Sequence, residues 1–294
     1  LVGDVTAQIT EASKRGLEFS LGAQKALLDE MIEAGSSALE HTQAQMNVAS
    51  EFASKVAEAH SFKDIVKACQ ECSQHQMDIV RPITKWAATC FDIRQIPEYL
   101  SLAFRYATQG RPGPVFVELP PDILSVGVEE SQVTMPAQPA RQYRMHPDDQ
   151  DLRTAADLIN NARKPLFLGG SGVGLSSASE SLKKFIEKTG IPFMLLNYGR
   201  GELPDDHPNS VMEMGNLGLM FGIGQTDVIV AAGLRFNWTL QSGQLIPPSV
   251  KLVRIDIDPH ELDRNCRATV GLAGDIASVL EQLTAQVREN NHSG

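Results

Sequence analysis

The sequence lacks any apolar run that approaches the ~18 residues needed for a membrane-spanning helix, which argues against a helical membrane protein. It also lacks an excess of positive charge, because its formal net charge is −10. A protein dedicated to nucleic-acid binding would present a basic face, so the negative net charge argues against that class of protein. Four cysteines in 294 residues are too few for a disulfide scaffold and favour a reducing compartment. No basic-then-apolar leader opens the chain. These features predict a cytoplasmic protein with no membrane span and no nucleic-acid partner.

Proline is absent from the first 81 residues, whereas all 16 prolines lie between Pro82 and Pro259. The same stretch has no tryptophan or tyrosine. Because proline breaks helix interiors, its absence permits long helices there. Glycine-rich turns and apolar runs typical of strands begin beyond this stretch. The composition therefore indicates two different kinds of protein joined near Val80.

The helical segment, residues 1–80, predicts two helices. Apolar residues recur at spacings of three and four, which predicts a long helix over 5–59. Ser61 and Asp64 form an N-terminal capping signal for a second helix over 62–79. Polar or small residues occupy the other positions on this side of the helix, where they would pack poorly in a coiled coil. The helices should therefore need a partner. A reversible coat on an apolar surface is the alternative. Cys69 and Cys72 have no second Cys/His pair nearby and are interpreted as two unconnected thiols.

The rest of the chain alternates strands and helices. A helix over 93–109 and a strand over 115–119 come first, and a proline-containing linker extends to about residue 147. Helices are then expected at 148–162, 176–189, 215–224 and 275–289, with strands at 165–169, 192–196, 227–232, 251–257 and 269–273. Continuous apolar strands between helices indicate a parallel sheet covered on both faces. The fold class is therefore α/β, a doubly wound parallel sheet over about 148–290, preceded by an all-α segment.

A glycine-rich turn, Gly169–Gly174, connects a predicted strand to a predicted helix. Glycines let a backbone approach a phosphate, and a helix start supplies N–H donors. The spacing is not G-x-G-x-x-G, and the next strand ends at Asn197 without an acid for a ribose, which argues against a nicotinamide site. A plain tight turn is the alternative to a phosphate site. Acids at other strand ends, Asp256 and Asp258, and Asp275 at a helix start, offer a place for an adenosine.

Several separated motifs carry a resemblance that covers about 81–290. "RPITKWA" (81–87), "GRPGPVFVELPPDIL" (110–124), "NYGRGELPDDHP" (197–208) and "RIDIDPHEL" (254–262) resemble the thiamine diphosphate-dependent acetolactate synthase-like enzymes. "GLRFNW" (233–238) resembles the 2-hydroxyacyl-CoA lyases and oxalyl-CoA decarboxylases of that superfamily. The resemblance implies the tail of a pyrimidine-binding domain at 81–128, a linker at 129–147 and a complete central domain at 148–290.

The same resemblance implies a carboligase or lyase that uses thiamine diphosphate and Mg2+. No glutamate matches the family's catalytic glutamate, because Glu118 lies on a later strand, and the magnesium motif Gly-Asp-Gly…Asn is not found. No catalytic or metal-binding residue is therefore predicted. The chain alone should not complete the chemistry, and its expected partners include the missing family domains or further copies of itself.

The resemblance also implies a nucleotide in the central domain, either FAD or ADP/CoA. Carried over position by position, the cofactor-binding candidates are Gly169, Gly170, Gly172, Arg235, Asp256 and Asp275. Arg235 would pair with a phosphate, although a structural role is the alternative. Asn237 and Trp238 stand where acetolactate synthases continue with Asp-Asp-Arg, which favours a CoA-type nucleotide over FAD.

A second resemblance covers residues 43–80, whose alanine-rich helix, break at His60–Ser61 and "FKDIV" opening resemble a phasin. Phasins coat bacterial polyhydroxyalkanoate granules. The alternative function is therefore a granule-associated or scaffold protein that carries the α/β domain, with a polymer-granule surface as its partner.

Overall fold

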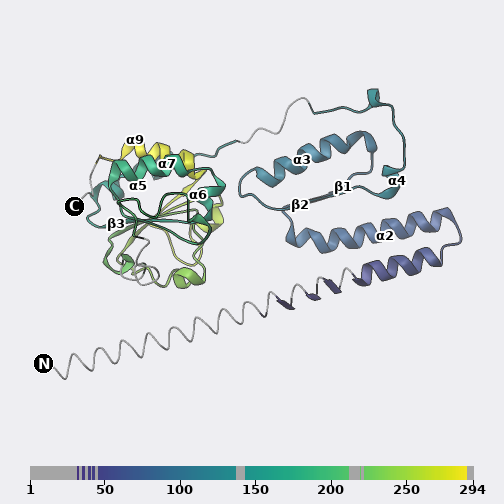
Figure 1. Cartoon of the computed structure of the whole chain (residues 1–294), viewed down its shortest axis with the longest axis horizontal. Helices are drawn as coiled ribbons and strands as arrows, with labels where there is room; N and C mark the ends of the chain where they lie inside the picture. The colour runs from purple at the N-terminus through teal and green to yellow at the C-terminus, as the bar shows by residue number, and fades with distance from the viewer. Residues whose placement is uncertain are drawn as a thin grey trace, which may run out of the picture. The chain divides into compact units, whose positions relative to one another are not determined.

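The computed structural model describes residues 32, 35–36, 39–40, 42–43, 46–136, 143–211, 219 and 222–289. The chain forms two compact units (Figure 1). Unit 1 comprises residues 1–108 and 113–141, and unit 2 comprises residues 109–112 and 142–294. Most of the helix predicted over 5–59 lies outside the described residues, and its last part is helical from 46 to 57. No helix among the described residues is long and apolar enough to cross a membrane.

Helix α2, Phe62–Val80, begins where the capping signal predicted. The Ser61 hydroxyl accepts a hydrogen bond from the Asp64 amide at 3.2 Å, and the Asp64 carboxylate accepts one from the His60 amide. The helix ends in a short 3-10 turn, η1, over Arg81–Ile83, where Pro82 prevents the α-helix from continuing. The second predicted helix is therefore confirmed, apart from one residue at its end.

A two-stranded parallel sheet follows in unit 1. Strand β1, Trp86–Thr89, pairs with β2, Val115–Glu118. Helix α3, Ile96–Thr108, connects them, and its first predicted turn is a separate 3-10 turn, η2, over Ile93–Gln95. Short helices α4, Pro121–Leu124, and η3, Glu130–Gln132, come next. The sequence patterns did not predict β1, because it carries two alanines and a threonine instead of large apolar residues.

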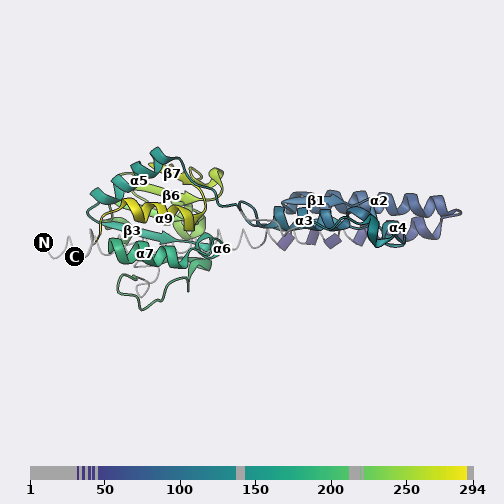
Figure 2. The same ribbon diagram turned by 90° about the horizontal axis from the view of Figure 1, so that it is seen from above.

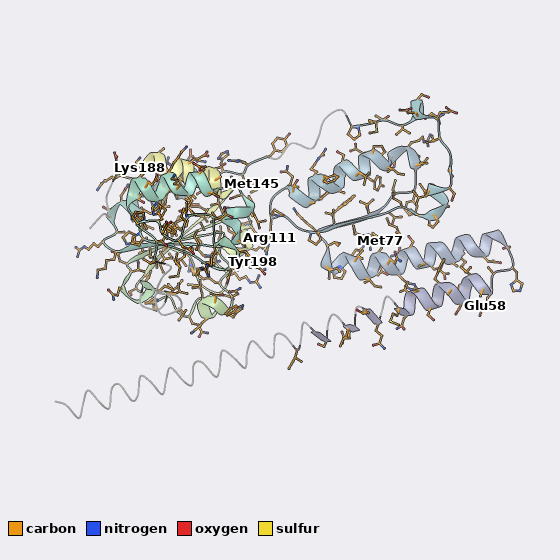
Figure 3. The ribbon with its side chains drawn as sticks, in the orientation of Figure 1. Glu58, Met77, Arg111, Met145, Lys188 and Tyr198 are labelled. Atoms are coloured by element: carbon orange, nitrogen blue, oxygen red, sulfur yellow. The ribbon has the colours of Figure 1, made fainter. Side chains whose placement is uncertain are left out.

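Figure 1 shows α2 and α3 on opposite sides of the two strands. Met77 of α2, labelled in Figure 3, is buried. The carboxylate of Glu118, at the end of β2, joins the elements of this unit. It accepts hydrogen bonds from the Ser73 hydroxyl of α2 at 2.6 Å and from the Thr89 hydroxyl of β1 at 2.8 Å.

Unit 2 contains a five-stranded sheet in the order β4-β3-β5-β6-β7, with every pair parallel. The strands are β3 Pro165–Gly169, β4 Phe193–Leu195, β5 Val228–Ala232, β6 Lys251–Asp256 and β7 Val270–Ala273. The main helices are α5 Asp149–Asn161, α6 Ser171–Leu175, α7 Ser179–Thr189 and α9 Ile276–Gln286, with 3-10 turns η4 Asn197–Gly199, η6 Trp238–Gly243 and η7 Pro259–Glu261. This architecture confirms the predicted α/β fold class.

One predicted helix of unit 2 needs a correction. The helix expected over 176–189 begins three residues later, as α7, and the glycine-rich turn before it forms a separate short helix, α6. Ser177 between them has a φ of 52°, in the left-handed region that breaks an α-helix. The expected helix over 215–224 is helical at its described positions, residue 219 and residues 222–225.

Two apolar layers cover the sheet. Alternate strand residues such as Phe167 and Val230 pack with α5, α7 and α9 on one face. Their neighbours, such as Leu168 and Ile229, pack on the other face against apolar residues that precede and follow β5, namely Leu219, Ile223, Leu234, Phe236, Leu240, Ile246 and Val250. Figure 2 shows α5, α7 and α9 against the strands. Because both faces are buried, the strands read as unbroken apolar runs, which is why the sequence patterns located them.

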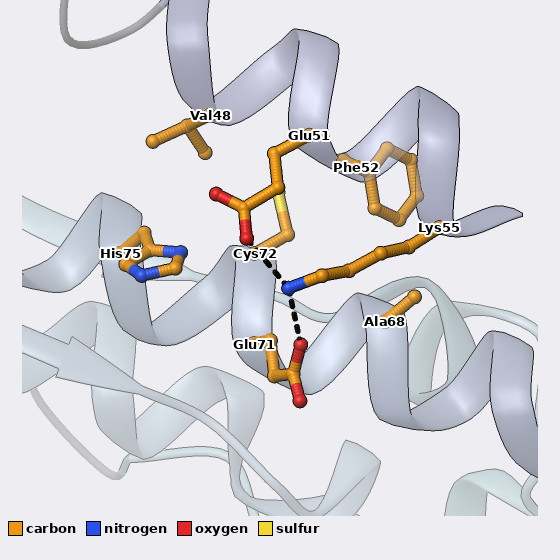
Figure 4. A pocket seen from close by; sticks show the side chains of 8 residues that line it. All are labelled: Val48, Glu51, Phe52, Lys55, Ala68, Glu71, Cys72 and His75. Atoms are coloured by element: carbon orange, nitrogen blue, oxygen red, sulfur yellow. Dashed lines mark hydrogen bonds and ion pairs between the residues drawn. The ribbon is translucent and has the colours of Figure 1, made fainter.

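Unit 1 has a much smaller core. Among its described residues, the buried apolar side chains are Ala68, Met77, Cys90 and Ala103. The helix at 46–57 is tied to α2 by Lys55, whose ammonium lies 2.7 Å from Glu51 and 2.6 Å from Glu71 (Figure 4). The hydrogen bonds from Lys55 to Glu51 and then to Glu71 raise the pKa of the ammonium.

Candidate functional site

The candidate site lies at the carboxyl edge of the five-stranded sheet. The chain runs outward from β3 to β4 and then crosses to β5, so the strand order reverses between β3 and β5. Ligands of doubly wound folds bind at such a switch point, outside the carboxyl ends of the strands. The glycine-rich turn follows β3, Arg235 follows β5, Asp256 ends β6 and Asp275 follows β7. Parallel pairing therefore brings all the predicted positions to one edge.

The glycine-rich turn packs backbone to backbone against the loop after β5. The Gly170 amide donates to the Ala232 carbonyl at 2.9 Å, and the Gly172 amide donates to the Gly233 carbonyl at 3.1 Å. A Cβ on Gly172 would lie 2.6 Å from the Gly233 Cα, closer than real Cβ atoms approach non-bonded atoms. Loop packing thus requires these glycines, and it uses two of the N–H groups that the sequence offered to a phosphate.

The other glycines of this edge also fill close contacts. A Cβ on Gly169 would lie 2.5 Å from Leu195 Cδ2, and one on Gly199 would lie 2.6 Å from the Gly170 carbonyl oxygen. Gly174 faces the carboxylate of Glu202, which accepts a hydrogen bond from the Ser179 hydroxyl. Sequence reasoning missed the packing roles of Gly199 and Glu202. Both belong to the quoted motif at 197–208, so the motif itself was the available signal.

Arg235 is exposed, two residues after Gly233, whose φ of +54° turns the chain at the end of β5. The loop continues to Asn237, which caps η6 by accepting from the Thr239 amide at 3.2 Å. Sequence reasoning also missed two aromatic residues on the loops of this edge. Trp238 is 57% exposed and Tyr198, labelled in Figure 3, is 88% exposed.

Asp256 is half-buried, and this burial raises the pKa of its carboxyl group. One carboxyl oxygen accepts from the Asp258 amide at 3.0 Å. The neighbouring Asp258 lies 3.7 Å from Arg111, which is 3.5 Å from Glu261 and lies in the segment 109–112 (Figure 3). The acids after β6 therefore already have partners within unit 2.

Arg254, two residues before Asp256, is fully buried on the same strand. One guanidinium nitrogen donates to the Arg264 carbonyl at 2.9 Å, and Cζ lies 4.0 Å from the Phe236 ring centroid. The Nη2 nitrogen is buried without a protein partner. Burial lowers the pKa of this guanidinium. Arg254 fixes the loop after β6 to the loop after β5, beneath the candidate site.

Asp275 has a local structural role as well. It is the N-cap of α9, where its carboxylate accepts from the Ser278 amide at 3.0 Å. Arg144 approaches the same carboxyl oxygen at 3.7 Å. Helix capping alone accounts for an aspartate at this position. Of the predicted site side chains, Arg235 is exposed, and Asp256 and Asp275 each use one carboxyl oxygen to accept from a nearby backbone amide.

A metal site does not emerge from the described residues, which hold no group of three or more His, Cys, Asp or Glu side chains placed to bind an ion. The pocket between the helix at 46–57 and α2 contains His75 and Cys72, but Lys55 lies between its two glutamates (Figure 4). These residues do not fit a magnesium-bound diphosphate, and no catalytic step through thiamine diphosphate follows from them.

Residues 152–283 match the family model described as thiamine pyrophosphate enzyme, central domain. This part of the chain is homologous to the central domain of thiamine diphosphate-dependent enzymes. The match runs from α5 to α9 and so contains the whole sheet and all the predicted site positions. The resemblance to thiamine diphosphate-dependent enzymes is confirmed, whereas the phasin resemblance of residues 43–80 stays a prediction.

The relatives of this central domain are acetolactate synthase-like and 2-hydroxyacyl-CoA lyase-like. A probable acetolactate synthase large subunit of Methanocaldococcus jannaschii is 33% identical over 216 residues, 71% of this chain and 36% of that protein. The human 2-hydroxyacyl-CoA lyase 1 is 34% identical over 215 residues, 72% of this chain and 36% of that protein. A thiamin diphosphate-dependent enzyme of Mycobacterium smegmatis superimposes with a TM-score of 0.58 at 25% identity, over 73% of this chain and 41% of that one. The chain thus spans little more than a third of its curated relatives.

Proposed function

We propose that unit 2 is the nucleotide-binding module of a thiamine diphosphate-dependent carboligase or lyase, and that it takes the ADP part of a CoA-type nucleotide. The observation that carries the proposal is the position of Arg235. Its loop touches the glycine-rich turn at the switch point, since a Cβ on Gly233 would lie 2.5 Å from the Gly172 Cα. An exposed guanidinium there can pair with a phosphate.

Asp256 would accept a hydrogen bond from a ribose hydroxyl with the carboxyl oxygen that does not bind the Asp258 amide. The exposed rings of Tyr198 and Trp238 are aromatic surfaces on which a base can stack. The glycine-rich turn would let the backbone come close to the phosphate but would supply few N–H donors, because the Gly170 and Gly172 amides are already hydrogen-bonded. FAD is the second nucleotide to compare.

Calorimetry with CoA, ADP and FAD tests the proposal. We expect weak binding of CoA and ADP, and Arg235→Ala should weaken it by about 1–3 kcal/mol, the range for a charged hydrogen bond. Arg163→Ala is the matched control, because Arg163 is also exposed but precedes β3 at the amino edge of the sheet. Absence of heat with all three nucleotides, or an equal loss in both variants, would contradict the nucleotide site.

We further propose that this chain alone does not turn over a keto acid or an acyl-CoA. Support comes from the missing glutamate and magnesium motifs and from the absence of a metal-binding cluster among the described residues. Thiamine diphosphate with Mg2+ should then leave the melting temperature unchanged, since only a ligand that binds the native state stabilises it. The same proposal keeps a cytoplasmic location, which the thiols of Cys90 and Cys266, neither of them in a disulfide, favour.

A second candidate function, association with an apolar polymer surface, has one observation in its favour. Ile32, Leu39 and Met46 are about two-thirds exposed and recur every seven residues, so they share one side of a helix. The full chain should partition onto polyhydroxyalkanoate granules, and Leu39→Glu with Met46→Glu should abolish it. Leu175→Glu, at an exposed leucine of unit 2, is the control. Equal partitioning of all variants would reject this function.

A further inference from the structure

Helix α3 of unit 1 carries apolar side chains on two sides. One side packs on the sheet: Ala103 is buried, and Tyr106 stacks on Trp86 of β1 with ring centroids 5.2 Å apart. The other side exposes Leu100, which is 44% exposed, and Phe104, which is 69% exposed. These two residues are one helical turn apart and so form a continuous stripe. Exposed apolar stripes of this kind mark interaction surfaces.

Two charged residues lie across Ser101 from the stripe and have opposite signs at opposite ends of the helix. Glu98 lies in the first turn of α3 and Arg105 in its last turn, and both are exposed. They are seven residues apart, about two turns, and therefore lie on the same side of the helix. Their midpoint coincides within half a residue with the midpoint of Leu100 and Phe104.

We propose that α3 is a self-docking surface on which a second copy of this chain places its own α3 in the antiparallel direction. With a two-fold axis through the middle of the helix, Leu100 of one copy packs on Phe104 of the other, and Glu98 faces Arg105. The axis creates each contact twice, as an isologous interface requires. The half-buried Ser101 near the centre is small enough for a close approach of the two helices.

The small core of unit 1 gives a physical reason for this association. Its described part buries Ala68, Met77, Cys90 and Ala103 but exposes large apolar side chains around the two-stranded sheet. A two-stranded parallel sheet is rarely stable without further cover. Pairing of α3 helices would remove part of that apolar surface from water without any other protein.

Light scattering across a dilution series of the full chain tests the proposal. The wild-type chain should dimerise. Phe104→Glu should raise the dissociation constant about a hundredfold, because it buries a charge in place of a central ring. An exposed ion pair changes an association constant up to about fivefold. Glu98→Arg removes both copies of the Glu98–Arg105 pair from the dimer, so it should weaken dimerisation about tenfold. Leu175→Glu in unit 2 is the control and should leave the dimer unchanged.

The double variant Glu98→Arg with Arg105→Glu decides the geometry. It restores the pairing between copies but opposes the dipole of its own helix, so recovered dimerisation cannot come from a more stable α3. Circular dichroism of each variant checks that it is folded. A wild-type chain that stays monomeric, a Phe104→Glu variant that still dimerises, or a charge-swapped variant that does not recover would each overturn the proposal.

Discussion

The replacement Gly172→Ala should destabilise unit 2, because its added methyl group meets the backbone of another loop. The new Cβ would lie 2.6 Å from the Gly233 Cα and 2.9 Å from Ile276 Cδ1. The isoleucine can change rotamer, but the Gly233 backbone is bonded to the turn through the Gly172 amide at 3.1 Å. The two loops must therefore separate.

Overpacking of this kind costs about 1–3 kcal/mol, and a backbone neighbour places the effect toward the upper end. For a unit of this size each kcal/mol lowers the melting temperature by about 2–4 °C, so we expect a decrease of roughly 4–10 °C. Gly224→Ala is the matched control. It is exposed and helical with open space around its Cβ position, and should gain about 0.5–1 kcal/mol.

Scanning calorimetry measures both variants, and fluorescence assigns the transition to a unit. The chain has two tryptophans, Trp86 in unit 1 and Trp238 in unit 2. In a Trp86→Phe background the remaining tryptophan reports on unit 2. A Gly172→Ala chain that melts like wild type but no longer binds nucleotide would refute the packing argument. It would indicate that Gly172 is needed for phosphate binding instead.

Asp256→Asn should stabilise unit 2 increasingly as the pH rises above about 4, which is the carboxyl pKa in the unfolded chain. Burial raises the pKa of Asp256 in the folded chain, so ionisation of this carboxyl group destabilises the folded state. Urea unfolding at acidic and at mildly alkaline pH measures this, and equal effects at both, or the same trend in the exposed control Asp206→Asn, would contradict it. Glu118→Ala leaves two hydroxyl donors without their acceptor and should cost unit 1 about 2–3 kcal/mol, measured through the fluorescence of its own tryptophan; an unchanged midpoint would show that the glutamate does not join the elements. A fragment of residues 143–290 should be about 1 kcal/mol more stable to urea than 148–290, since the Met145 carbonyl accepts from the Asp275 amide at 3.0 Å, and equal stability would place the boundary at 148.

The local sequence determined most of the elements of this protein. Continuous apolar strands, buried on both faces, gave β3 to β7 their positions within about two residues. The Ser61–Asp64 cap located α2, since capping depends on neighbouring residues alone. The order of separated motifs was also enough to identify the thiamine diphosphate-dependent relatives, because motif order survives where overall identity is low.

The tertiary structure alone decided what the site residues do. The sequence offered Gly170 and Gly172 as phosphate donors, but their amides bind the carbonyls of Ala232 and Gly233, in β5 and the loop after it, far away in the chain. Asp275 serves as a helix cap, and Arg254, which no pattern singled out, is buried beneath the site without a full set of partners. Each outcome depends on which loops meet at the carboxyl edge, a property of strand order rather than of local residues. Strand β1 was missed for the same reason, since its small residues become a strand through pairing with β2 and contact with α3.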